Sequence, residues 1–246
     1  MIEFRNVSKE YGKSGKLALD GLNLTIGDGE LFGFIGPNGA GKTTTIKILT
    51  GIIAPTAGES FVNGICMQRS PMEAKRLIGF VPDGAELFDR LTGLEYLNFM
   101  ADMYDVSAQD RKKHIEKYLS LFELEDAAAS QIRTYSKGMR QKLATIGALI
   151  HHPPIWVLDE PMMGLDPRAS FLLKEEMKRH CAEGNTVFFS THVLEVAEKL
   201  CSRIAVISGG NLIAEGTMEE LRRAEGASSL EEIFLELTGD AEEAVQ

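Results

Sequence analysis

The chain has 246 residues, of which 44% are hydrophobic and 25% charged, close to the average of soluble globular proteins. This composition excludes long disorder, collagen-like repeats and low complexity, and the length suits one domain with insertions or two subdomains that share a core. Its 26 Lys and Arg against 36 Asp and Glu give a net charge of −10, which argues against a nucleic-acid partner.

Cysteine usage and hydropathy predict a cytosolic protein. The three cysteines, Cys66, Cys181 and Cys201, form no Cys-x-x-Cys pair, as expected of packing thiols in a reducing compartment. The N-terminus lacks the basic and then apolar layout of a secretion signal. Because no apolar run approaches the roughly 20 residues that span a bilayer, any membrane role would come through a partner.

The first part of the chain predicts strands around a glycine-rich loop. Residues 2–7 alternate apolar and polar side chains and predict a strand. The segments 22–26 and 30–35 flank Gly-Asp-Gly and predict a hairpin. The glycine-rich loop that follows leads into a helix predicted over residues 43–50 and closed by Gly51.

The rest of the chain predicts a helical insertion and then an α/β pattern. Residues 84–150 carry long helical periodicity and no clear strand. Short apolar runs then predict strands buried on both faces, and helical patterns lie between them; the strands are 155–159, 186–190 and 203–207, and the helices 168–182 and 193–200. Strands that alternate with helices predict a mainly parallel sheet.

Two further elements are predicted near the C-terminus. Residues 205–208 and 212–216 flank Gly-Gly-Asn and predict a second hairpin. The segment 228–239 has apolar side chains at the spacing of an amphipathic helix, namely Leu230, Ile233, Phe234 and Leu237.

A phosphate-binding loop is the strongest motif. The stretch GPNGAGKTT satisfies the G-x-x-x-x-G-K-[ST] pattern with the residues Gly36, Pro37, Asn38, Gly39, Ala40, Gly41, Lys42, Thr43 and Thr44. Its glycines let backbone N–H groups surround phosphate oxygens at a helix N-terminus. Lys42 supplies a charge to the outer phosphates, and the Thr43 hydroxyl can bind Mg²⁺. The alternative is an ordinary glycine turn before a helix.

Two acidic residues end the predicted strand 155–159. Because α/β sheets bind ligands at the carboxyl ends of their strands, Asp159 is placed to hold Mg²⁺ and Glu160 to accept a proton from an attacking water. The alternative for Glu160 is a helix-entry charge.

The order of the motifs resembles the ATP-binding cassette (ABC) ATPases from about residue 2 to residue 216. YSKGMRQKL at 135–143 precedes IWVLDEP, and GLDP at 164–167 follows it. The strand TVFFS continues into Thr-His and so ends on His192, and no NKxD guanine-reading motif is present.

The resemblance implies roles for individual residues. It implies that Tyr11 stacks on adenine and that Lys42, Glu160 and His192 are catalytic. It also implies that one subunit contacts the ATP of the other through Ser136, Lys137, Gly138 and Asp166. Local alternatives are a turn tyrosine for Tyr11 and helix capping for Ser136 and Asp166. The remaining histidines, His114, His151, His152 and His180, are interpreted as structural.

The resemblance also implies a P-loop NTPase fold. It is an α/β core with an antiparallel β region and an inserted helical subdomain. The implied divisions are 1–83 with 151–216 for the core, 84–150 for the helical subdomain with the signature motif, and 217–246 for a helical tail.

The chain departs from the family pattern at two places. In the signature, usually LSGGQ, Tyr135, Lys137 and Met139 are substitutions, and this variant and the tail resemble bacterial exporters. Asp83 stands where the family usually has a Gln that touches Mg²⁺ and links to the membrane partner. A carboxylate oxygen can still bind Mg²⁺.

Three functions are therefore weighed. The first is the ATPase of a membrane exporter, with Mg²⁺ and ATP held between two head-to-tail subunits, identical or different. It would sit on the inner face of the membrane through a permease that docks near residues 83–100, although apolar side chains there also serve the helical core. The second is a soluble or regulatory ABC ATPase, and the third is a binding module without turnover. The presence of Lys42, Asp159, Glu160 and His192 argues against the third.

Overall fold

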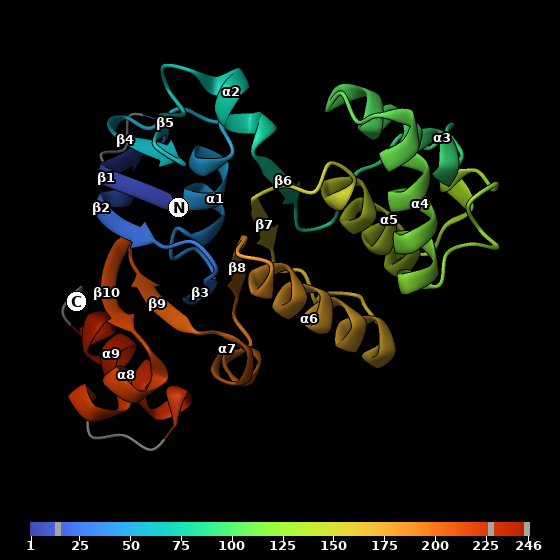
Figure 1. The fold of residues 1–246 in the computed structure, drawn as a ribbon. Helices are drawn as coiled ribbons and strands as arrows, with labels where there is room; N and C mark the ends of the chain where they lie inside the picture. Colours follow the sequence, from blue (N-terminus) through green and yellow to red (C-terminus); the bar gives the residue numbers. More distant parts are fainter. Residues whose placement is uncertain (13–15, 226–228, 244–246) are drawn as a thin grey trace.

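A computed structural model describes residues 1–12, 16–225 and 229–243. Figure 1 shows two sheets, a group of helices set to one side of them, and a small helical group near the C-terminus. The strands are β1 (Ile2–Glu10), β2 (Leu17–Ile26), β3 (Leu31–Ile35), β4 (Ala57–Val62), β5 (Ile65–Cys66), β6 (Ile78–Val81), β7 (Ile155–Asp159), β8 (Thr186–Thr191), β9 (Arg203–Ser208) and β10 (Asn211–Gly216). The helices are α1 (Lys42–Leu49), α2 (Pro71–Arg76), α3 (Gly93–Met103), α4 (Ala108–Phe122), a 3₁₀ turn (Ile132–Thr134), α5 (Lys137–Leu149), α6 (Pro167–Ala182), α7 (Leu194–Leu200), α8 (Met218–Glu225) and α9 (Leu230–Glu243).

The two sheets have different topologies. The first is antiparallel with the order β2-β1-β4-β5, and the second has the order β10-β9-β3-β8-β7-β6. In the second sheet β6, β7, β8, β3 and β9 run parallel, whereas β10 pairs with β9 antiparallel. The predicted α/β fold with a mainly parallel sheet is confirmed, as is the hairpin formed by β9 and β10.

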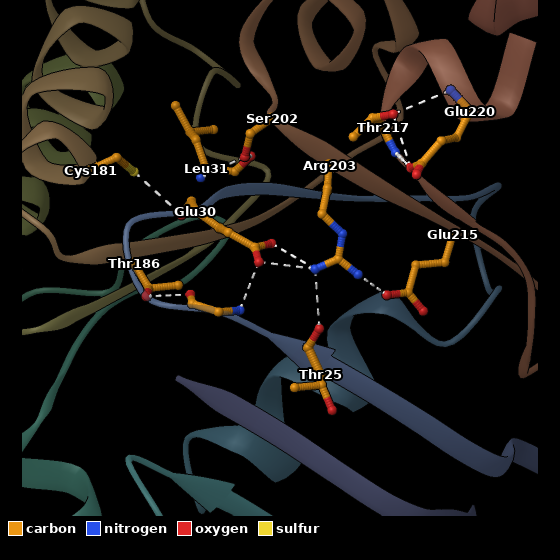
Figure 2. Close-up of polar contacts among 11 residues, drawn as sticks. Thr25, Glu30, Leu31, Cys181, Thr186, Ser202, Arg203, Glu215, Thr217 and Glu220 are labelled. Carbon is orange, nitrogen blue, oxygen red and sulfur yellow. Dashed lines mark hydrogen bonds and ion pairs between the residues drawn. The ribbon is translucent and has the colours of Figure 1, made fainter.

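The hairpin predicted over 22–26 and 30–35 is wrong, because these segments lie in different sheets. β2 pairs with β1, whereas β3 lies between β8 and β9. Figure 2 shows the contacts that hold the segment between β2 and β3, where the chain passes from one sheet to the other. Arg203 Nη1 donates to the Glu30 carboxylate at 2.8 Å, and Thr186 Oγ1 donates to the Gly27 carbonyl at 2.9 Å. Partners distant in the sequence therefore override the local turn signal.

Strands β4, β5 and β6 were not predicted from the sequence. β4 carries a glycine and polar residues and β5 has only two residues; they are strands because β4 pairs with β1 and β5 pairs with β4. β6 is a four-residue strand at the edge of the parallel sheet and pairs with β7.

The parallel strands separate two cores. Along β7, Ile155 and Val157 face the core shared with α1 and the antiparallel sheet, whereas Trp156 and Leu158 face the core shared with α5 and α6. All five β7 residues are buried, as the continuous apolar run predicts. Two packed faces therefore fix the strand whose end carries Asp159.

The segment 84–150 is helical in the structure, with one isolated bridge between Thr92 and Gln131. A capping box between Thr92 and Glu95 starts α3. The helices pack through buried side chains that include Leu97, Tyr118, Phe122, Ile132 and Leu143.

The C-terminal helices cover β9 and β10 (Figure 1). Leu230 and Ile233 are buried there with Leu221, and Phe234 and Leu237 pack beside them, which confirms the amphipathic pattern. Of the predicted tail 217–246, residues 226–228 and 244–246 lie outside the described residues, as do 13–15 of the predicted core. Among the helices that the structure describes, none combines the length and apolar character needed to cross a membrane.

Candidate active site

The glycine-rich loop lies between the buried strand β3 and the start of α1. Gly41 precedes the helix with a φ of +113°, which only glycine adopts without strain, and a Cβ there would lie 2.6 Å from the Ala18 carbonyl oxygen. Because Gly41 has no side chain to cap α1, the first N–H groups of the helix are left for another acceptor. This end of α1 is therefore suited to an anion.

Lys42 is buried at the centre of the loop. Its Nζ donates to the carbonyl oxygens of Gly36 at 2.7 Å and Pro37 at 3.1 Å. Since an ammonium group has three donors, one remains for a phosphate oxygen. Burial lowers the pKa of Lys42, and the negative charges of Glu160 and Asp159 oppose this effect. The loop thus holds its cation beside two carboxylates, with the nearest Glu160 oxygen at 3.9 Å.

Asp159 ends β7 and is 3% exposed. Its Oδ1 accepts a hydrogen bond of 2.5 Å from Ser190 Oγ on the neighbouring strand β8. The same hydroxyl accepts from the Glu160 N–H at 3.1 Å. Ser190 thereby fixes the carboxylate of one residue and the backbone of the next.

Glu160 and His192 meet at the carboxyl edge of the parallel sheet. The backbone of Glu160 has a φ of +47°, an uncommon value for a residue with a side chain. Its Oε2 lies 3.0 Å from His192 Nδ1. The acidic residue thus stands between Lys42 on one side and His192 on the other.

A cavity of about 270 Å³ opens over these groups. It is lined by Ala18, Asn38, Gly39, Gly41, Lys42, Thr43, Thr44, Asp83 and Glu160. Thr43, Asp83 and the neighbouring Asp159 offer oxygen atoms, which are the ligands that Mg²⁺ prefers. These oxygen donors therefore fit Mg²⁺, and the glycine-rich loop with Lys42 fits the phosphates that would accompany the ion.

The shared cavity gives Asp83 a testable role. Asp83→Ala is expected to raise about tenfold the Mg²⁺ concentration for the half-maximal rate of the ATP hydrolysis that the sequence predicts, because it removes one oxygen donor near the metal. Asp83→Gln keeps an oxygen at that position and serves as the control. The measurement is a Mg²⁺ titration of the hydrolysis rate, and an unchanged profile for Asp83→Ala excludes the role.

Tyr11 lies beside the phosphate loop. Its hydroxyl is 3.4 Å from Thr44 Oγ1, and the side chain is half-exposed. Lys9 Nζ lies 5.4 Å from the centre of its ring. This position allows the ring to stack on a base whose phosphates occupy the loop, and the adenine role stays a prediction.

The predicted trans-acting residues gather in a second cluster. Ser136 caps α5 by accepting from the Met139 N–H, and Asp166 caps α6 by accepting from the Ala169 N–H. The start of α6 lies beside the first two turns of α5, since Lys142 Nζ on α5 is 3.9 Å from Asp166 Oδ2. Gly138 faces the Gly164 carbonyl. The local capping interpretation of both residues is correct, and it leaves a helix N-terminus available to an anion.

The two clusters lie apart within one chain. None of Ser136, Lys137, Gly138 or Asp166 is among the described residues that line the cavity at Lys42. Lys137 instead lines a second cavity of about 310 Å³ with Gly84, Ala85, Arg140 and Gln141. This cavity brings the segment after Asp83 next to the start of α5.

The unusual signature residue Tyr135 has a structural role. It is buried, and its hydroxyl donates to the Ala127 carbonyl at 2.6 Å. The hydroxyl also lies under Gly93, where a Cβ would come within 2.3 Å of it. Tyr135 therefore joins the start of α5 to α3 and leaves Ser136 and Gly138 on the outer side.

Sequence reasoning missed Ser190 as a site residue. Its position in TVFFSTH, two residues before His192, is the only signal in the chain that points to it. Its partner Asp159 is 31 residues away, and strand pairing alone brings them together.

Known proteins are similar to this chain in sequence. The profile of the family described as ABC transporter matches residues 19–163. The Nod factor export ATP-binding protein I of Burkholderia orbicola is 38% identical over 95% of this chain and 76% of its own length. An uncharacterized ABC transporter ATP-binding protein of Nostoc sp. is 40% identical over 83% of this chain, which spans 61% of that relative.

Solved structures extend the similarity to the fold. The ATP-binding subunit of an ABC transporter superposes with a TM-score of 0.92 and 33% identity, covering 97% of this chain and 99% of that one. A dimeric ATP-binding cassette in a post-hydrolysis state, bound to ADP and Pi, gives 0.78 at 30% identity, covering 89% and 99%.

Proposed function

The chain belongs to the ABC transporter family as an ATP-binding, ATP-hydrolysing subunit, and from this premise we propose that it powers export across a membrane. The observation that carries the proposed ATP-driven activity is a cavity that joins the phosphate loop to Glu160 and Asp83. The direction of transport rests on relatives named for Nod factor export and for linearmycin resistance in Bacillus subtilis.

The chemistry follows from the positions of the side chains. Lys42 and the N–H groups of α1 bind the phosphates, and Mg²⁺, when bound through Thr43, Asp159 and Asp83, neutralises charge on them. Glu160 accepts the proton of the attacking water. His192, whose Nδ1 contacts Glu160 in this structure, holds that carboxylate in place, and its other ring nitrogen would donate to the γ-phosphate.

The second cluster completes the site in a dimer. In the proposed head-to-tail pair, the start of α5, with Ser136, Lys137 and Gly138, faces the γ-phosphate held by the other subunit, and Asp166 lies at the same interface. The anion-binding end of α5 and its separation from the cavity of its own chain support this arrangement. The dimeric form of a related cassette with ADP and Pi supports it as well.

An apolar groove supplies the proposed permease contact, which would place the chain at the inner face of the membrane. It lies between α2 and α3 and is lined by Met72, Lys75, Arg76, Phe99, Met100, Met103 and Tyr104. Met72 and Met103 are largely exposed, and Phe99 is partly exposed. Of the apolar residues predicted for docking within 83–100, Leu97 is buried in the helical core, whereas Phe88 and Leu94 are exposed.

Binding to membranes tests the groove. Purified chain is expected to sediment with membranes of its native cells after their peripheral proteins have been stripped, and Met103→Glu is expected to weaken this binding at least tenfold by placing a charge in the groove. Leu235→Glu, at an exposed apolar position on α9, is the matched control. Binding that survives Met103→Glu, or that survives proteolysis of the membranes, contradicts docking on a permease.

A further inference from the structure

A cluster of metal-binding side chains lies away from the ATP cavity. It combines His152, in the loop between α5 and β7, with His180 and Glu183 at the C-terminal end of α6. One ligand atom from each of these residues lies within 4.8 Å of the others. The proposed mechanism of ATP hydrolysis uses none of the three.

His180 is the fixed member of the cluster. It is fully buried, and neither ring nitrogen has a hydrogen-bond partner within the described part of the chain. The ring packs edge-on against Trp156 and His152, with centroid separations of 5.6 and 5.8 Å. A buried imidazole without a partner is costly, and a bound cation would give one of its two nitrogens a partner.

Glu183 brings a carboxylate whose two oxygens have separate partners. Its Oε1 is paired with Arg179, and its Oε2 faces His152 Nε2 at 3.6 Å. Carboxylates that bind metals are commonly held by such an outer hydrogen bond. His152 stands opposite on an exposed loop with a φ of +52°.

We propose that His152, His180 and Glu183 bind a divalent transition metal of the Zn²⁺ type, with water as the fourth ligand. Two imidazoles and one carboxylate favour such an ion over Mg²⁺, which prefers oxygen ligands. A tetrahedral ion about 2.1 Å from each ligand atom needs those atoms about 3.4 Å apart. Since His152 and Glu183 are at the surface, rotation of their side chains closes the remaining gap.

The position of the site gives the metal a structural consequence. It would join the loop after α5 to the end of α6. At their N-terminal ends these helices are capped by Ser136 and Asp166, the residues proposed to meet the partner's nucleotide. A bound ion would therefore restrain the two helices relative to each other.

Zn²⁺ binding to the chain without an affinity tag tests the proposal, with excess Mg²⁺ present to occupy the ATP cavity. We expect one Zn²⁺ per chain by equilibrium dialysis, and at least tenfold weaker binding in His152→Asn and in Glu183→Gln. Asn is chosen because it tolerates the positive φ at this position. With Co²⁺ as the probe, the wild type is expected to show the visible absorption of a tetrahedral site, and the variants are expected to lose it.

A matched histidine variant separates this site from the ATP cavity. His192→Asn removes the imidazole beside Glu160 and is expected to bind Zn²⁺ as the wild type does. Zn²⁺ should also raise the unfolding temperature of the wild type and of His192→Asn, but not that of His152→Asn. Unchanged Zn²⁺ affinity in His152→Asn and Glu183→Gln, loss confined to His192→Asn, or no binding to the wild type would overturn the proposal.

Discussion

Glu160→Gln is expected to lower the rate of ATP hydrolysis at least about 100-fold while ATP binding stays intact, because the amide keeps the shape of the side chain but cannot accept a proton. Gln has the same size as Glu, so it fits the cavity beside the phosphate loop and can keep the contact with His192. Steady-state phosphate release gives the rate, and equilibrium binding of a fluorescent ATP analogue gives the affinity.

An exposed glutamate serves as the control for this variant. Glu195→Gln, on α7, removes a charge of the same kind from a surface ion pair with Lys199 and is expected to keep the wild-type rate. Because slow hydrolysis prolongs the nucleotide-bound state, Glu160→Gln should also form dimers in ATP that are visible by analytical ultracentrifugation. Hydrolysis by Glu160→Gln at the wild-type rate would reject Glu160 as the base.

Mixing two inactive variants is expected to restore hydrolysis. Lys42→Ala removes the phosphate-binding cation, and Gly138→Asp sets a negative charge at the start of α5, where it repels the γ-phosphate. In a head-to-tail pair of one Lys42→Ala chain and one Gly138→Asp chain, one site keeps both an intact loop and an intact signature. Random pairing of equal amounts leaves about a quarter of all sites intact, so about a quarter of the wild-type rate should return.

A second mixture provides the matched control. Lys42→Ala and Glu160→Gln damage the same half of the composite site, so each heterodimer retains no intact site and the rate should stay low. Circular dichroism establishes that Gly138→Asp folds, since a Cβ at this position lies 3.1 Å from the Gly164 carbonyl oxygen. If the first mixture stays inactive although the variants form dimers, the signature does not act across the interface.

The sequence predicted the elements whose signals are local. The phosphate loop and the start of α1 can be predicted because the glycines, the helix start and Lys42 all lie in one contiguous segment. The same holds for α5, whose cap Ser136 bonds the Met139 N–H three residues away. The continuous apolar run of β7 likewise predicts a strand buried on both faces that ends at Asp159.

The tertiary structure alone decided which distant residues meet. The local turn signal at Gly27–Gly29 predicts a hairpin, but Arg203, 173 residues from Glu30, holds that segment in the crossing between two sheets. Likewise, pairing of β7 with β8 brings Ser190 to Asp159, and the edge that these strands share brings His192 to Glu160. Hydrophobic periodicity reports which face of an element is buried, not which element covers it. For the same reason, the contact of His152 with His180 and Glu183 is visible only once α6 has packed against the sheet.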